Sequence, residues 1–163
     1  MKARILLGLV ALIVVMASSG SLVASADAVV PFRATYVTHP TQVDLDEGVI
    51  TLAIPGEGKG THLGLSTWYA DSLVDTNYYP FVQTGEMTFT AANGDQLSGT
   101  FAGLAVPTGE TTVEFSGDFE ISAGAGRFEG MTATGSYWGM ADMAANQGIL
   151  YLSLIHISEP TRL

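Results

Sequence analysis

Alternation of apolar and polar residues with a period of two is the feature of this sequence that most restricts its fold. From Thr112 to Ile121 the apolar residues include Val113, Phe115 and Phe119, and the residues beside them are polar or acidic. Successive side chains of a strand point to opposite faces, so the pattern predicts a strand with one buried and one exposed face. No stretch after residue 26 has the i, i+3, i+4, i+7 spacing of a long amphipathic helix, which favours an all-β domain.

The same alternation recurs in short runs along the chain. We expect further strands over residues 32–37, 50–54, 63–69, 87–90, 97–101, 131–140 and 148–151. Asn93 and Gly94 lie between two of these runs, and both tolerate positive φ, so this dipeptide predicts a hairpin turn. About eight strands at short spacing favour a barrel or a sandwich. We expect two longer loops, at residues 38–47 and 71–80.

The first 26 residues have the organisation of an export signal. Lys2 and Arg4 precede a run of twelve apolar residues, and an Ala-Ser-Ala cleavage site ends at Ala26. That run is shorter than the roughly 20 residues that span a bilayer. We therefore predict a signal helix at 1–26 that is cleaved, a secreted, periplasmic or extracellular domain, and no stable membrane span after cleavage. An uncleaved anchor is the alternative.

Residues 152–162 resemble the conceptual translation of a transposase-type sequencing adapter. The resemblance covers eleven consecutive residues, Leu-Ser-Leu-Ile-His-Ile-Ser-Glu-Pro-Thr-Arg. We therefore expect residues 27–151 to be the natural domain and residues 152–163 to be an artefactual tail. A natural C-terminal strand is the alternative, because residues 152–157 also alternate.

Charge and composition exclude several classes of partner. Residues 27–151 hold fifteen acidic and three basic side chains, a formal charge of −12. Phosphate recognition needs clustered Lys and Arg, so we expect no nucleic acid and no anionic membrane surface as a partner. The charge favours solubility, with a cation-binding surface as the alternative. The chain has no cysteine, which excludes disulfides and cysteine-based zinc sites.

We expect neither a metal nor a cofactor. His39 and His62 lie in different segments, whereas a metal site needs three or four converging ligands. The acidic stretch from Asp44 to Gly48 has only part of the spacing of a calcium loop. Catalytic residues stay unassigned, because Ser66 lacks the surroundings of a nucleophile elbow.

Aromatic residues supply the candidate contacts for a ligand. These are Tyr36, Trp68, Tyr69, Tyr137 and Trp138. Trp68-Tyr69 and Tyr137-Trp138 are consecutive pairs within expected strands, so one member of each pair faces inward and the other outward. The sequence does not say which. Filling of the core is the alternative role for the inward member.

The stretch from Phe119 to Gly130 resembles a motif of dirigent proteins and allene oxide cyclases, Ile-x-x-Gly-x-Gly-(Arg/Lys)-Phe-x-Gly. Its places are filled here by Ile121, Gly124, Gly126, Arg127, Phe128 and Gly130. The likeness extends over most of residues 32–151, although only this motif is specific. It implies an eight-stranded antiparallel, calycin-like barrel with a central cavity, of the secreted bacterial branch, in which the glycines form a tight turn and Phe128 plugs one end. The polar cavity residues of the family's enzymes have no match here.

Three interpretations of function follow. The first is a barrel that binds a small apolar or amphipathic molecule without catalysis. The second is a cyclase or isomerase of the allene oxide cyclase or dirigent type, which requires a buried carboxylate or tyrosine with a perturbed pKa. The third is a structural or surface-interaction module, including a homo-oligomer, with a filled core and an exposed apolar patch.

Overall fold

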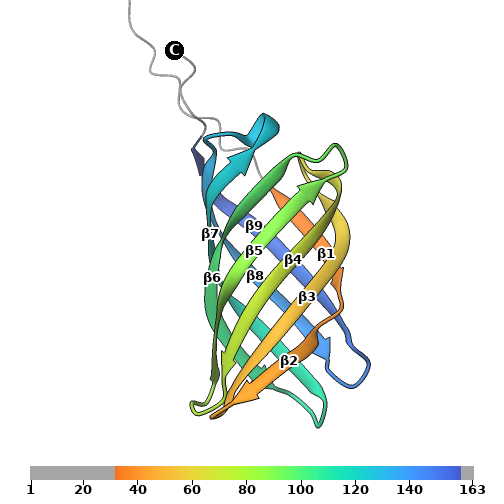
Figure 1. Ribbon diagram of the computed structural model, residues 1–163, viewed down its shortest axis with the longest axis vertical. Coiled ribbons are helices and arrows are strands. Elements are labelled where there is room, and N and C mark those ends of the chain that lie inside the picture. The colour runs from red at the N-terminus through yellow and green to blue at the C-terminus, as the bar shows by residue number, and fades with distance from the viewer. Residues whose placement is uncertain (1–31, 159–163) are drawn as a thin grey trace, which may run out of the picture.

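The computed structural model describes residues 32–158. These residues form nine strands and one short 3-10 helix, joined by turns (Figure 1). The strands are β1 (Arg33–Thr38), β2 (Thr41–Asp46), β3 (Val49–Gly60), β4 (Gly64–Asp75), β5 (Phe81–Ala91), β6 (Gln96–Pro107), β7 (Thr112–Ala125), β8 (Thr132–Asp142) and β9 (Gln147–Ser158). The helix, η1 (Gly126–Phe128), follows β7 directly. No helix within this segment is long and apolar enough to cross a bilayer.

Eight of the strands close into an antiparallel barrel. Each strand from β3 to β9 pairs with its sequence neighbour, β9 pairs with β1, and β1 pairs with β3 to complete the ring. The predicted all-β class and the eight-stranded antiparallel barrel are therefore confirmed. The predicted signal helix at 1–26 lies outside the described residues.

The ninth strand, β2, corrects the loop expected at residues 38–47. β3 is long enough to pair with two strands end to end, with β1 through Gly56–Gly60 and with β2 through Val49–Ala53. Pro40, which has no N–H to donate, interrupts the chain between β1 and β2. A turn with positive φ at Glu47 (46°) and Gly48 (84°) then returns it to β3. The Asp residues that suggested a loop lie in a strand whose side chains are all exposed.

The second expected loop, at residues 71–80, is shorter than predicted. β4 continues to Asp75 and pairs with β3 and β5 along its length. Ser72 and Val74 face the interior, whereas Asp71 and Leu73 face outward. The prediction of a polar loop was wrong because Asp71 lies on the outward face of a regular strand.

The last strand includes residues of the expected artefactual tail. Leu152 is buried and pairs with Ala34 of β1, and Ser153 pairs with Arg33. In this structure these residues therefore take part in closing the barrel. Their origin as an adapter translation stays a prediction.

One end of the barrel is filled by side chains. The turn after Asn93 has Gly94 at φ 88° and connects β5 to β6 at this end. η1 lies at the same end, with Gly126 at φ 68° and Gly130 at φ 75°. A side chain on Gly124 would collide with the backbone of Phe128, whose ring is buried. A void of about 20 Å³ lies at this end, between Phe128 and residues such as Leu63 and Leu97.

Inward aromatic rings lie against glycines that pair with them on the neighbouring strand. The pairs are Tyr36 with Gly58, Trp68 with Gly56, Phe101 with Gly85, Phe115 with Gly139 and Phe119 with Gly135. A Cβ added at Gly85, Gly135 or Gly139 would lie 2.5–2.6 Å from a ring atom. The missing side chains therefore make the room that the rings occupy.

Candidate functional site

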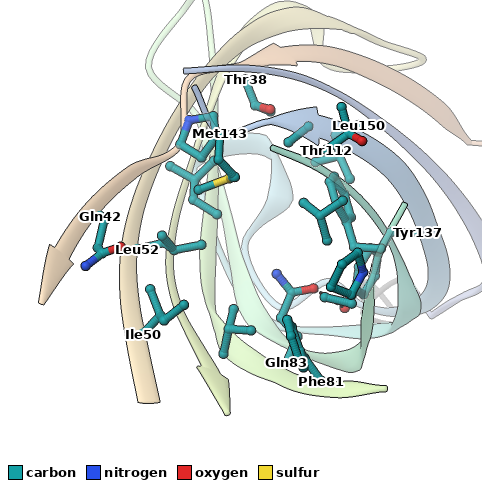
Figure 2. A pocket seen from close by; sticks show the side chains of 18 of the residues that line it. Thr38, Gln42, Ile50, Leu52, Phe81, Gln83, Thr112, Tyr137, Met143 and Leu150 are labelled. Carbon is teal, nitrogen blue, oxygen red and sulfur yellow. Dashed lines mark hydrogen bonds between the residues drawn. The ribbon is translucent and has the colours of Figure 1, made fainter. Parts of the chain in front are cut away.

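The other end of the barrel opens into a cavity of about 290 Å³ (Figure 2). Pro40, Met143 and the β6–β7 connection around Glu110 lie at its mouth. Further inside, the wall is mainly apolar, with Ile50, Leu52, Val74, Phe101, Phe115 and Leu150 among its residues. An apolar cavity closed at one end and open at the other is the usual form of a small-ligand site.

A polar cluster interrupts the apolar wall. Gln83 and Tyr137 both line the cavity, and the Tyr137 hydroxyl donates to Gln83 Oε1 at 3.3 Å. Gln83 Nε2 in turn donates to Ser72 Oγ at 3.1 Å. All three side chains are buried. Each therefore needs these bonds, because a buried polar group without a partner is costly.

Burial raises the pKa of the Tyr137 phenol well above its ordinary value, and the negative charge of Asp118 adds to the effect. Desolvation penalises the phenolate, and a nearby anion does the same. Tyr137 therefore keeps its proton at neutral pH and acts as a hydrogen-bond donor.

The structure settles the orientation of both consecutive aromatic pairs. Trp68 and Tyr137 are 7% and 6% exposed and line the cavity. Tyr69 and Trp138 are 45% and 55% exposed and lie on the outer face of the barrel. Of the five candidate ligand contacts, these last two are therefore away from the cavity.

Tyr36 is fully buried but does not line the cavity. Its hydroxyl shares a 2.8 Å hydrogen bond with Ser66 Oγ, and its ring packs against Trp68 and Phe89. Burial raises the pKa of Tyr36, and the bond to Ser66 opposes the shift. Tyr36 therefore packs against Trp68, a residue of the cavity wall, without lining the cavity itself.

Among the described residues, the buried indole N–H of Trp68 has no hydrogen-bond partner. Its Cε3 edge faces β3, where a Cβ on Gly56 would lie 3.4 Å away. Trp68 is one of the residues that line the cavity.

The ionisable groups near the cavity are few. Glu110 is the carboxylate among the described lining residues, and it is exposed at the mouth. Lys, Arg and His are absent from that lining set. The cavity wall therefore offers no positive charge to an anionic ligand.

The other candidate chemistries are not assembled in the described part of the chain. No three His, Asp or Glu side chains there come close enough together to hold a metal ion. Glu114, Asp118 and Glu120 lie exposed on the outer face of β7, as the alternation of that strand predicted. They cannot act together on a molecule inside the barrel.

Gln83 and Ser72 are functional candidates that the sequence reasoning missed. Gln83 occupies an inward position in a run whose other inward residues are Phe81, Gly85, Met87, Phe89 and Ala91. A polar residue on the apolar face of an alternating strand was the available signal.

An exposed apolar patch lies on the outer face of β8, β9 and β1. Trp138 stacks on Tyr151 with centroids 4.3 Å apart. Met140 pairs with Ile149, which pairs with Val37. Trp138, Met140 and Val37 are each more than 40% exposed.

Comparisons with known proteins identify no relative. No family model, no curated protein and no solved structure matches the chain.

Proposed function

We propose that this protein is a secreted barrel that binds one small apolar or amphipathic molecule in its cavity, without catalysis. The observation that carries the proposal is the open cavity of about 290 Å³ with its mainly apolar wall. Burying an apolar ligand there removes both ligand and wall from water, at roughly 25 cal/mol per Å². Secretion is part of the proposal and rests on the signal-like residues 1–26.

The cavity sets the size of the ligand. An apolar cavity of about 150 Å³ holds a benzene molecule. A cavity of 290 Å³ therefore suits a ligand of about twice that size, about 12 non-hydrogen atoms. Naphthalene, with ten carbons, is a suitable neutral probe.

A matched pair of substitutions on β6 tests the proposal. Ala105 is buried and lines the cavity, whereas Ala102 is exposed on the outer face of the same strand. We expect Ala105→Phe to fill part of the cavity and to weaken naphthalene binding at least about tenfold, because overlapping volumes are costly. Ala102→Phe should leave binding unchanged. Titration calorimetry with naphthalene measures both, and equal affinities in all three proteins would exclude the cavity as the site.

A cyclase or isomerase is a second candidate, in keeping with the proposed kinship to allene oxide cyclases and dirigent proteins. Tyr137 favours it, because a buried tyrosine with a raised pKa can donate a hydrogen bond to developing negative charge. It ranks second because proton transfer also needs a base beside the substrate. Glu110, at the mouth, is the carboxylate among the described lining residues.

A surface-interaction module is the third candidate, favoured by the patch around Trp138. It includes a homo-oligomer formed through that patch. The open cavity argues against the filled core that this interpretation required.

A further inference from the structure

The side-chain amide of Gln83 indicates which kind of ligand the cavity binds. This inference rests on the proposed binding function. Gln83 is 7% exposed and belongs to the mainly apolar wall of the cavity. Figure 2 shows its side chain pointing inward, with the nitrogen toward the open space and the oxygen toward Tyr137.

One of the two amide hydrogens of Gln83 is available to a ligand. A glutamine side chain has two N–H donors and one carbonyl acceptor. The carbonyl accepts from Tyr137, and one N–H donates to Ser72. The second N–H has no bond recorded to any described residue.

The orientation of the amide follows from Tyr137. A buried hydroxyl needs an acceptor for its hydrogen, and Gln83 Oε1 is the acceptor that the described residues offer it. Turning the amide over would leave that hydrogen unpaired. The Tyr137 bond therefore fixes the carbonyl oxygen of Gln83 on the Tyr137 side and its amide nitrogen on the Ser72 side.

Charge restricts the ligand further. A carboxylate buried in the cavity would have no cation among the described lining residues, and it would have to pass Glu110 at the mouth. Burying an unpaired charge costs far more than one hydrogen bond returns. The amide N–H is an electropositive group, so it does not favour a cationic ligand either.

We propose that the cavity selects a neutral molecule with an apolar body and one hydrogen-bond acceptor, a carbonyl, which binds Gln83 Nε2. The apolar wall holds the body of the ligand. Gln83 recognises the acceptor, and Ser72 and Tyr137 position Gln83.

The test compares four probes of one chain length: nonane, 2-nonanone, 2-nonanol and nonanoate. Equilibrium dialysis against the purified protein, with gas chromatography of each compartment, gives every dissociation constant. We expect 2-nonanone to bind more tightly than nonanoate. In Gln83→Leu the affinity for 2-nonanone should fall about tenfold, because its carbonyl loses its partner, while the affinity for nonane is kept or improved.

Thr84→Leu is the matched control, because Thr84 is the exposed neighbour of Gln83 on β5. It should change none of the four constants. If Gln83→Leu does not fold, the side-chain amide resonance of Gln83 in the ¹⁵N-labelled wild-type protein replaces it. That resonance should shift with 2-nonanone and not with nonane.

The outcomes separate this inference from the proposed function. If none of the probes binds, nonane included, the binding function itself fails. If nonane and 2-nonanone bind in the same ratio to wild type and to Gln83→Leu, the binding function stands and the role of Gln83 is overturned. Tightest binding of nonanoate would overturn the selection for neutral ligands.

Discussion

Gly135 and the ring of Phe119 illustrate, at the scale of single residues, how the interior of this barrel is packed. They face each other across β7 and β8, and four other glycine and aromatic pairs repeat the arrangement. Packing of this density leaves no room for an added methyl group. The glycines of such strands are therefore part of the core, although they contribute no side chain.

Replacing Gly135 tests this packing. A Cβ at Gly135 would lie 2.4 Å from the carbonyl oxygen of Ser153 and 2.5 Å from Phe119 Cζ. We expect Gly135→Ala to lower the free energy of unfolding by about 1–3 kcal/mol, the usual cost of overpacking. Urea denaturation measures the change. Thr134→Ala, on the exposed side of the same strand, is the control, and equal stability of the two variants would contradict the packing argument.

The buried tyrosines predict how stability depends on pH. Tyr137 and Tyr36 both have a pKa raised by burial. An unfolded tyrosine ionises near pH 10, so above that pH the unfolded chain releases protons that the folded chain keeps. Their contribution to stability is therefore complete below about pH 10 and is lost as the pH rises through the folded pKa values.

Tyr137→Phe should make the loss of stability above pH 10 less steep, and adding Tyr36→Phe should reduce the slope further. Urea denaturation midpoints at several pH values between about 9 and 11 measure the slope. An unchanged slope in the double variant would show that neither phenol is linked to folding.

The strands show, at the scale of elements, what alternation can and cannot predict. β7 was predicted because its inward residues are large and its outward residues are acidic. β2 and the second half of β4 were missed because Val43, Leu45 and Leu73 face outward and Asp residues alternate with them. Side-chain polarity reports burial, and a strand with little burial therefore gives a weak signal.

For a related reason, the sequence could not predict which face of each aromatic strand points into the barrel. Both faces of β4 carry apolar residues, with Trp68 and Val74 inside and Tyr69 and Leu73 outside. Only the tertiary structure decides between them. Gln83 and Ser72 meet on neighbouring strands, and their contact depends on a register that the sequence does not state.

β2 should be the least protected strand of the described segment. It pairs with β3 alone, and all six of its side chains are exposed. We expect its backbone amides to exchange with deuterium at least about tenfold faster than those of β5, which is paired on both sides. Exchange followed by mass spectrometry measures both peptides. Equal protection would mean that another segment or chain covers β2.

At the scale of the whole molecule, the barrel has one filled end and one open end. The filled end holds η1 with the ring of Phe128, and the open end holds the cavity and Glu110. The strand number predicted a barrel or a sandwich, and the closed eight-stranded barrel was expected only from the resemblance of the glycine motif to a known family. The cavity volume was not, because it depends on how the inward rings and their glycines share the space.

The way in which β3 divides its length between β1 and β2 has a consequence for the passage of a ligand. The ladder that closes the barrel, between β1 and Gly56–Gly60, lies beyond the part of β3 that holds β2. Bending β2 outward about Pro40 would widen the entrance while every pair of that ladder stayed intact. We therefore expect substitutions in β2 and its turn, other than at the cavity-lining Gln42, to change the rate at which a molecule enters and leaves more than its affinity for the interior.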